Sequence, residues 1–402
     1  MTRHYMVLYG TVEALFGLSG AWFLATINWS LYQHFHNLMT LGLVNAILAG
    51  LGLLKGPAGA LGDRGQRRLF IGLSLWTRTG AAMLALLDRD LASLLCAIGI
   101  YAIAQTVFRP NLTASLNEQV PDVQRTFQNQ RLLGIQVLSR GMGLVAFMVS
   151  PVGQAANNYA LGTLMAAVAV LAVFLPTVHH KITQPNTRHR AVDLTGLGAL
   201  RQIDLVYWSL PGYALLNCGM ALVTGSLPAL TVTMLHGDHL VYGLLMAASL
   251  AAMTLGTLWG NCWASLSTQR RLYGSLAAIP VVYGAWIIEA HLWMAFAALT
   301  VLAAIGGQLS ALIVAYEQHR VDSRYRGAVT GITSGVTGAM GGAGSLTLVF
   351  VSGWPLVHMQ MLIAAIFGAA FLVLVGAFRR FYRSVEINPN RKEMQSSAGV
   401  GL

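Results

Sequence analysis

Residues 59–68 read Gly-Ala-Leu-Gly-Asp-Arg-Gly-Gln-Arg-Arg, and this short cationic loop lies between the apolar runs Leu38–Gly59 and Leu69–Leu87. An apolar run of about twenty residues matches the thickness of a bilayer when it is helical. Because lipid offers the backbone no hydrogen-bond partners, such a run is expected to cross the membrane as a helix. The stretch therefore predicts two transmembrane helices joined by a loop at a cationic membrane face.

The alternation of apolar runs and short polar loops continues along the whole chain. Hydrophobic residues make up 55% of the 402 residues and charged residues only 10%, whereas about a quarter of a soluble domain is charged. We therefore expect an all-α polytopic membrane protein with twelve transmembrane helices. The expected spans are Met6–Asn28, Leu38–Gly59, Leu69–Leu87, Leu91–Leu112, Arg131–Val152, Tyr159–Val178, Val206–Leu235, His239–Trp263, Leu272–Ile288, Leu292–Glu317, Ala328–Ser352 and Pro355–Phe378.

The cationic residues predict how the chain is oriented. Lys and Arg gather in every second loop and in the C-terminal tail, whereas the other loops hold only Arg89. Cationic loops stay on the cytoplasmic side, so both termini are expected in the cytoplasm and the protein in the cytoplasmic (inner) membrane of a bacterium. The net charge of +11 follows from this topology. Because that charge forms no single patch, we expect no binding of nucleic acid.

The two halves of the chain are similar in sequence. Gln66–Phe70 recurs as Gln269–Tyr273, each reading Gln-Arg-Arg-Leu followed by an aromatic residue, and the long loop His179–Gln202 separates six expected spans from six. Two such halves, with substrate bound between them near the middle of the membrane, are typical of transporters. The expected domains are an N-terminal six-helix bundle of residues 1–178, a cytoplasmic loop of residues 179–205, a C-terminal six-helix bundle of residues 206–380 and a cytoplasmic tail of residues 381–402.

The loop at residues 59–68 resembles the signature that connects the second and third helices in the major facilitator superfamily (MFS), with departures at Gly62 and Gln66. The resemblance covers the whole chain and implies transport by alternating access. It also implies a gate in which Asp63 pairs with a cation of the second half. The simpler alternative is that the loop arginines only set the topology. The gating candidates are Asp63, Arg64, Arg67, Arg68, Arg324 and Arg326.

Glu13 is the only carboxylate that lies well inside an expected span. A charge in the hydrocarbon region is costly and usually faces a cavity or a functional partner. Burial favours the protonated form of a carboxylate, so Glu13 can alternate between two states during a transport cycle. We expect it to couple transport to a proton gradient, without any cofactor. The alternative is a structural Glu that is hydrogen-bonded to neighbouring helices.

Three arginines lie inside the expected spans against this one acid, namely Arg78 in the third, Arg109 in the fourth and Arg140 in the fifth. The planar guanidinium holds carboxylates through paired hydrogen bonds. An excess of buried positive charge therefore indicates an anionic substrate. The alternatives are that Arg78 pairs with Glu13 and that Arg109 extends to the membrane surface. Further candidates for the substrate site are Gln308, Tyr316 and Asn217, which lies near the position corresponding to Glu13 in the second half. Trp76, Tyr101 and Tyr213 could add aromatic surface, and the alternative for each is lipid contact or helix packing.

Three segments narrow the resemblance within the superfamily. Phe108–Leu112 and Leu116–Asn129 resemble the connection between the fourth and fifth helices in the enterobactin-exporter and macrolide-efflux branch. Ser150-Pro151 partly matches the Gly-Pro motif of exporters, with Ser in place of Gly. Together with the buried charges, these segments predict proton-coupled export, by antiport, of a small polar anionic metabolite. The most specific substrate that we predict is a carboxylate-type siderophore.

Other functions are compatible with parts of the pattern. Efflux of cationic or neutral drugs would need Glu13 to bind a cation, which the nearby arginines disfavour. Import is a further alternative, because a fold does not set the direction of transport. A membrane enzyme would need clustered catalytic groups, but His34 and His36 have no carboxylate close in sequence. The three cysteines are too scattered for a metal site. We therefore expect no enzyme and no metal, and a monomer in the lipid bilayer that binds a small molecule.

Overall fold

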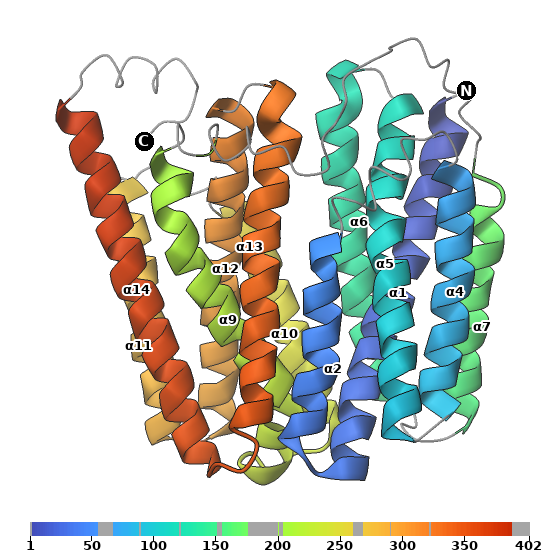
Figure 1. Cartoon of the computed structure of the whole chain (residues 1–402), viewed down its shortest axis with the longest axis horizontal. Coiled ribbons are helices and arrows are strands. Elements are labelled where there is room, and N and C mark those ends of the chain that lie inside the picture. The colour runs from blue at the N-terminus through green and yellow to red at the C-terminus, as the bar shows by residue number, and fades with distance from the viewer. Residues whose placement is uncertain are drawn as a thin grey trace. The chain divides into compact units, whose positions relative to one another are not determined.

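The computed structural model describes residues 2–54, 67–87, 90–119, 122–150, 155–175, 200, 204–259, 268–289, 291–320 and 323–387. Within these ranges the secondary structure is entirely helical, as predicted, with twelve α-helices and one 3-10 helix (Figure 1). They are α1 (Thr2–Phe35), α2 (Leu38–Gly50), η1 (Leu51–Leu54), α4 (Arg67–Leu87), α5 (Leu91–Gln119), α6 (Asp122–Val149), α7 (Ala155–Ala172), α9 (Asp204–Thr233), α10 (His239–Trp259), α11 (Thr268–Ile288), α12 (Leu292–Arg320), α13 (Ser323–Phe350) and α14 (Leu356–Ile387).

Seven of the described helices are long and apolar enough to cross a membrane. Four further apolar helical segments are shorter within the described residues, namely Leu38–Leu54, Gly134–Val149, Asn157–Ala172 and Tyr273–Ile288. The number of spans and the side on which the termini lie remain predictions. The seven segments are Met6–Phe35, Arg67–Leu87, Leu91–Thr113, Asp204–Thr233, His239–Leu258, Leu292–Ile313 and Leu356–Arg383.

The first helix is longer than the sequence predicts. α1 continues past the expected end at Asn28, and the added turns bury Leu31 and Tyr32. His36 follows the helix with a positive φ of 47°. The side chain of Asn37 then accepts a hydrogen bond from the backbone N–H two residues further on, which caps the start of α2. α5 also continues past its expected end, although it contains a proline.

The contacts between residues divide the chain into two compact units. In the first unit α1 lies along α6, and α4 lies along α5 and α7; in the second, α9 lies along α13, and α11 lies along α12 and α14. The first turns of α10 belong to the first unit, where Tyr242 stacks on Trp29 of α1 with ring centroids 5.6 Å apart. The first unit comprises Met1–Val192 and Gly237–Ala247, and the second comprises Asp193–His236 and Ala248–Leu402.

A similar close helix contact occurs in each unit. A Cβ atom on Gly143 of α6 would lie 2.2 Å from the backbone oxygen of Leu18 in α1, and one on Gly344 of α13 would lie 2.3 Å from that of Cys218 in α9. The two glycines are 201 positions apart in the sequence, and their partners are 200 positions apart. Small residues let membrane helices approach to backbone contact. The internal repeat of the sequence is therefore also a repeat of the packing.

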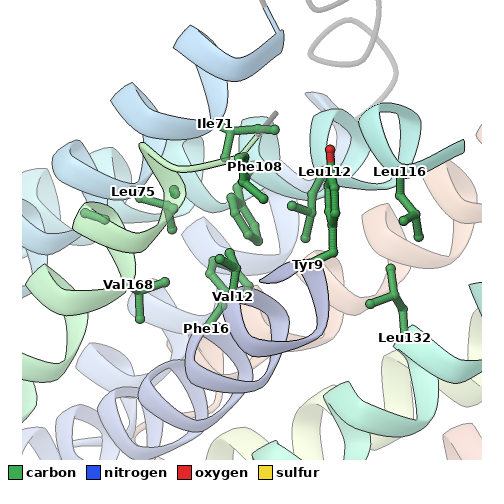
Figure 2. Packing of buried hydrophobic residues seen from close by; sticks show 13 residues of the cluster. Tyr9, Val12, Phe16, Ile71, Leu75, Phe108, Leu112, Leu116, Leu132 and Val168 are labelled. Atoms are coloured by element: carbon green, nitrogen blue, oxygen red, sulfur yellow. The ribbon is translucent and has the colours of Figure 1, made fainter. Parts of the chain in front are cut away.

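A cluster of buried hydrophobic side chains from α1, α4, α5, α6 and α7 packs inside the first unit (Figure 2). Phe16 of α1 stacks on Phe108 of α5 with ring centroids 4.1 Å apart, and Val168 of α7 belongs to the same cluster. This packing matters for the charged residues, because Arg109 directly follows Phe108 and Glu13 lies one turn before Phe16. The apolar core therefore fixes the backbone positions from which these charged side chains extend.

Candidate functional site

A buried carboxylate and a partly exposed guanidinium form an ion pair inside the first unit. Arg109 Nη2 donates a hydrogen bond to Glu13 Oε1 over 3.2 Å. The side chain of Glu13 is 5% exposed, whereas that of Arg109 is 35% exposed. A buried charge requires a partner. Here the acid is enclosed, while the cation that neutralises it can still be reached from outside.

A second guanidinium adds positive charge close to this pair. Arg140 lies on α6 and is partly buried, and its charge interacts with those of Glu13, Arg109 and Arg78. Arg140 precedes Gly143 by one helical turn, so the close α1–α6 contact holds it near Glu13. The four side chains together carry three positive charges and one negative charge. Such an excess attracts anions into a region of low dielectric constant.

Arg78 is held differently from the other two arginines. It is only 2% exposed, and its Nη2 donates to the backbone oxygen of Phe16 (3.3 Å), the hydroxyl of Ser19 (3.4 Å) and the hydroxyl of Tyr101 (3.2 Å). Its guanidinium also lies 4.0 Å from the ring centre of Phe16 and 5.2 Å from that of Tyr101. A Cβ atom on Gly20 would approach Nη2 to 2.8 Å. Arg78 is therefore a fixed interior charge among neutral groups.

These contacts decide between two pairings that the sequence left open. The acid pairs with Arg109, and no ion pair joins Arg78 to Glu13 in the described part of the chain. The sequence reasoning missed Phe16 and Ser19 as partners of Arg78. Phe16 follows Glu13 on α1 by three residues, and Ser19 follows Phe16 by three, so each step joins neighbours on the helix surface. That spacing was the available signal.

Two candidates of the second unit make contacts within it. Asn217 of α9 donates from its side chain to the backbone oxygen of Tyr213 over 2.8 Å. Gln308 of α12 accepts a hydrogen bond from the hydroxyl of Ser275 in α11 over 3.1 Å. Both are partly buried. Each interior amide therefore has at least one hydrogen bond within its own unit, and neither amide carries a charge.

The packing repeat shows which residue of the second unit corresponds to Glu13. Leu18 and Cys218 have the same role in the two close helix contacts. Counting back along the helices places Tyr213, and not Asn217, at the position of Glu13. The acid of the first unit is thus replaced by a neutral phenol in the repeat.

The remaining gating candidates are described only in part. Arg68 at the start of α4 donates to the backbone oxygen of Val173, just after α7, and so connects two helix ends of the first unit. Arg67 is partly buried and makes contacts of its own. Asp63 and Arg64 lie outside the described residues, as do the side chains of Tyr316, Arg324 and Arg326.

Comparison with known proteins identifies a matching family and similar solved structures. The family model described as Major Facilitator Superfamily matches residues 10–345. A bacterial homologue of the human lysosomal transporter Spinster, in an inward-facing and unoccupied conformation, superposes with a TM-score of 0.73 at 13% identity, over 95% of this chain and 98% of that chain. The nucleoside transporter NupG superposes with a TM-score of 0.72 at 12% identity, over 94% and 99%.

At these identities the structural likeness establishes the fold alone. A search of curated protein sequences finds no significant match. The family model, however, covers most of the chain. The chain belongs to the Major Facilitator Superfamily and is an integral membrane protein with the fold of its transporters.

Proposed function

We propose that this MFS transporter carries a small polar anion, with a carboxylate-type siderophore as the sharpest version, and that Glu13 couples its movement to protons. The observation that supports this proposal is the ion pair between buried Glu13 and partly exposed Arg109, with the charge of Arg140 near it. The planar guanidinium groups of Arg109 and Arg140 suit the carboxylates of such a substrate. Arg78 is enclosed by neutral partners and acts on the substrate through its charge, without direct contact.

Coupling follows from competition for one guanidinium. A substrate carboxylate and Glu13 both bind Arg109, so protonation of Glu13 releases Arg109 for the substrate. Two unit charges about 4 Å apart interact by about 4 kcal/mol at an effective dielectric constant of about 20. Water around Arg109, which is 35% exposed, reduces this energy. A quarter of it, about 1 kcal/mol, still changes affinity about fivefold.

Export is the direction favoured by the sequence resemblance to exporters. In this proposal the two halves rock against each other, both termini lie in the cytoplasm, and Asp63 with the surrounding arginines closes the cytoplasmic side. Asn217, Gln308 and Tyr316 complete the substrate site from the second half. The protein works as a monomer in the inner membrane and needs no cofactor besides the proton gradient.

The ion pair favours import as a second candidate. Because protonation of Glu13 frees Arg109 for an anion, the proton and the anion bind best together. A carrier with this linkage moves both in the same direction, and a proton gradient that is acidic outside would then drive uptake. Antiport requires the opposite linkage, in which substrate binding expels the proton.

Transport by purified protein in proteoliposomes tests both candidates. The substrate is a citrate-based siderophore, and the pH gradient is imposed first in one direction and then in the other. The variants are Glu13→Gln and, as a matched control, Glu289→Gln, which removes an exposed carboxylate after the end of α11. We expect wild type and the control to respond to the gradient and Glu13→Gln to transport without responding.

The direction of the response separates the mechanisms. Accumulation on the acidic side indicates exchange with protons, and accumulation on the alkaline side indicates cotransport. Transport of cationic drugs in place of the siderophore would refute the anion proposal. An undiminished gradient response in Glu13→Gln would refute the role of Glu13.

A further inference from the structure

The C-terminal half of α14 has one exposed face that changes from apolar to cationic along the helix. Leu372 is 68% exposed and Val373 is 37% exposed. On the same face, Arg379, Arg380 and Arg383 are all exposed. The opposite face packs into the second unit through buried Leu374, Ala377, Phe378 and Phe381. The rise from Val373 to Arg380 is about 10 Å, so this face extends from the acyl-chain region of a leaflet to its headgroups.

An aromatic residue orients the central arginine of this face. The guanidinium carbon of Arg380 lies 4.3 Å from the ring centre of Trp208 on α9. Trp208 is 36% exposed, and the neighbouring Tyr207 is 37% exposed. Tryptophan and tyrosine favour the level of the lipid headgroups. A guanidinium that stacks on a ring keeps its N–H donors at its edges, where they remain free to bind an anion.

The charge of this surface is positive even after the nearest acid on α9 is counted. The first turn of α9 contains Asp204, and Glu386 follows the arginines in the sequence of α14, so three arginines still outnumber two carboxylates. Arginine forms paired hydrogen bonds with phosphate, and cations near a membrane surface attract anionic lipids. A free anion would have no use for the apolar residues below the arginines, whereas a lipid would cover them with its acyl chains.

We propose that Arg379, Arg380 and Arg383, with Trp208 behind Arg380, bind the phosphate of an anionic phospholipid in the leaflet at this end of α14. The lipid's acyl chains lie along Leu372 and Val373. The site belongs to the outer surface of the second unit and is separate from the proposed transport chemistry of Glu13. A failure of either proposal therefore leaves the other intact.

Native mass spectrometry of the detergent-purified protein tests this site. The probes are phosphatidylglycerol and phosphatidylcholine with identical acyl chains. We expect wild type to prefer phosphatidylglycerol, and Arg380→Gln to weaken its binding about fivefold, since each cation near the surface contributes about 1 kcal/mol. The triple variant with all three arginines changed to Gln should lose the preference. Trp208→Leu keeps every charge and should weaken binding about two- to fivefold through the lost stacking.

Arg131→Gln is the matched control, because it removes an exposed arginine from α6 in the other unit. This control should retain the wild-type preference. Equal binding of the two lipids by wild type would overturn the proposal. So would an unchanged preference in the triple variant, or an equal loss in Arg131→Gln, which would show that only the total charge matters. If the triple variant does not fold, Arg380→Gln and Trp208→Leu decide the question.

Discussion

Replacing Gly143 by alanine should disturb both the stability and the transport site of the protein. The new Cβ atom would lie 2.2 Å from the backbone oxygen of Leu18. To reach 3.4 Å, where ordinary contact begins, α6 and α1 must separate by about 1.2 Å, which is the difference between these distances. The obstacle is backbone, so no side-chain rotation can relieve it. Since Arg140 lies one turn away on α6, it would move away from Glu13 with the helix.

Gly141→Ala is the control, because the added Cβ atom would meet nothing within 4 Å. Overpacking costs about 1–3 kcal/mol, whereas replacing an unconstrained helical glycine by alanine gains about 0.5–1 kcal/mol. The two variants should therefore differ by about 1.5–4 kcal/mol in the free energy of unfolding. We expect a lower melting temperature of the detergent-purified protein and slower transport in proteoliposomes for Gly143→Ala only. Equal melting temperatures and rates for the two variants would refute the reasoning.

Three further predictions concern the repeat and the buried charges. Gly344→Ala should lower the melting temperature and Gly341→Ala should not, because only the first meets backbone, at 2.3 Å; a reversed order would contradict the packing repeat. Arg109→Gln should lower the free energy of unfolding by about 1–3 kcal/mol, because it leaves a buried carboxylate without its partner. Glu13→Gln should lower it by less than about 1 kcal/mol, because Arg109 reaches water. Denaturant titration of both variants measures this difference. Arg78→Lys should lower the free energy of unfolding by about 1–3 kcal/mol through lost stacking and hydrogen bonds, and the KM for transport should not change. A raised KM at normal stability would show instead that Arg78 contacts the substrate.

Much of the fold was predictable because the bilayer imposes a simple rule on the chain. Long apolar runs must be helices in lipid, and all regular secondary structure in the described part of the chain is helical. Helix ends were less predictable. α1 continues past Asn28 because Leu31 and Tyr32 find buried positions, and hydropathy does not reveal such packing.

The interior charges were visible in the sequence, but their partners were not. Glu13, Arg78, Arg109 and Arg140 are conspicuous because each is costly in hydrocarbon. Which arginine meets Glu13 depends on how α1, α4 and α5 are rotated about their axes, and sequence spacing between helices carries no information on rotation. The packing repeat gives the register more finely, since it aligns Glu13 with Tyr213, one helical turn before Asn217.

The sequence by itself determined the solvent in which this protein folds, its helical class, its internal repeat and its excess of interior positive charge. These properties depend on composition and periodicity along one chain, to which the bilayer and the charge rule respond directly. Only the tertiary structure decided that Glu13 pairs with Arg109, that Arg78 is enclosed by Phe16 and Tyr101, and that glycines bring α6 to α1 and α13 to α9. These pairings arise from side-chain packing between helices, where a rotation or shift of one residue changes every partner.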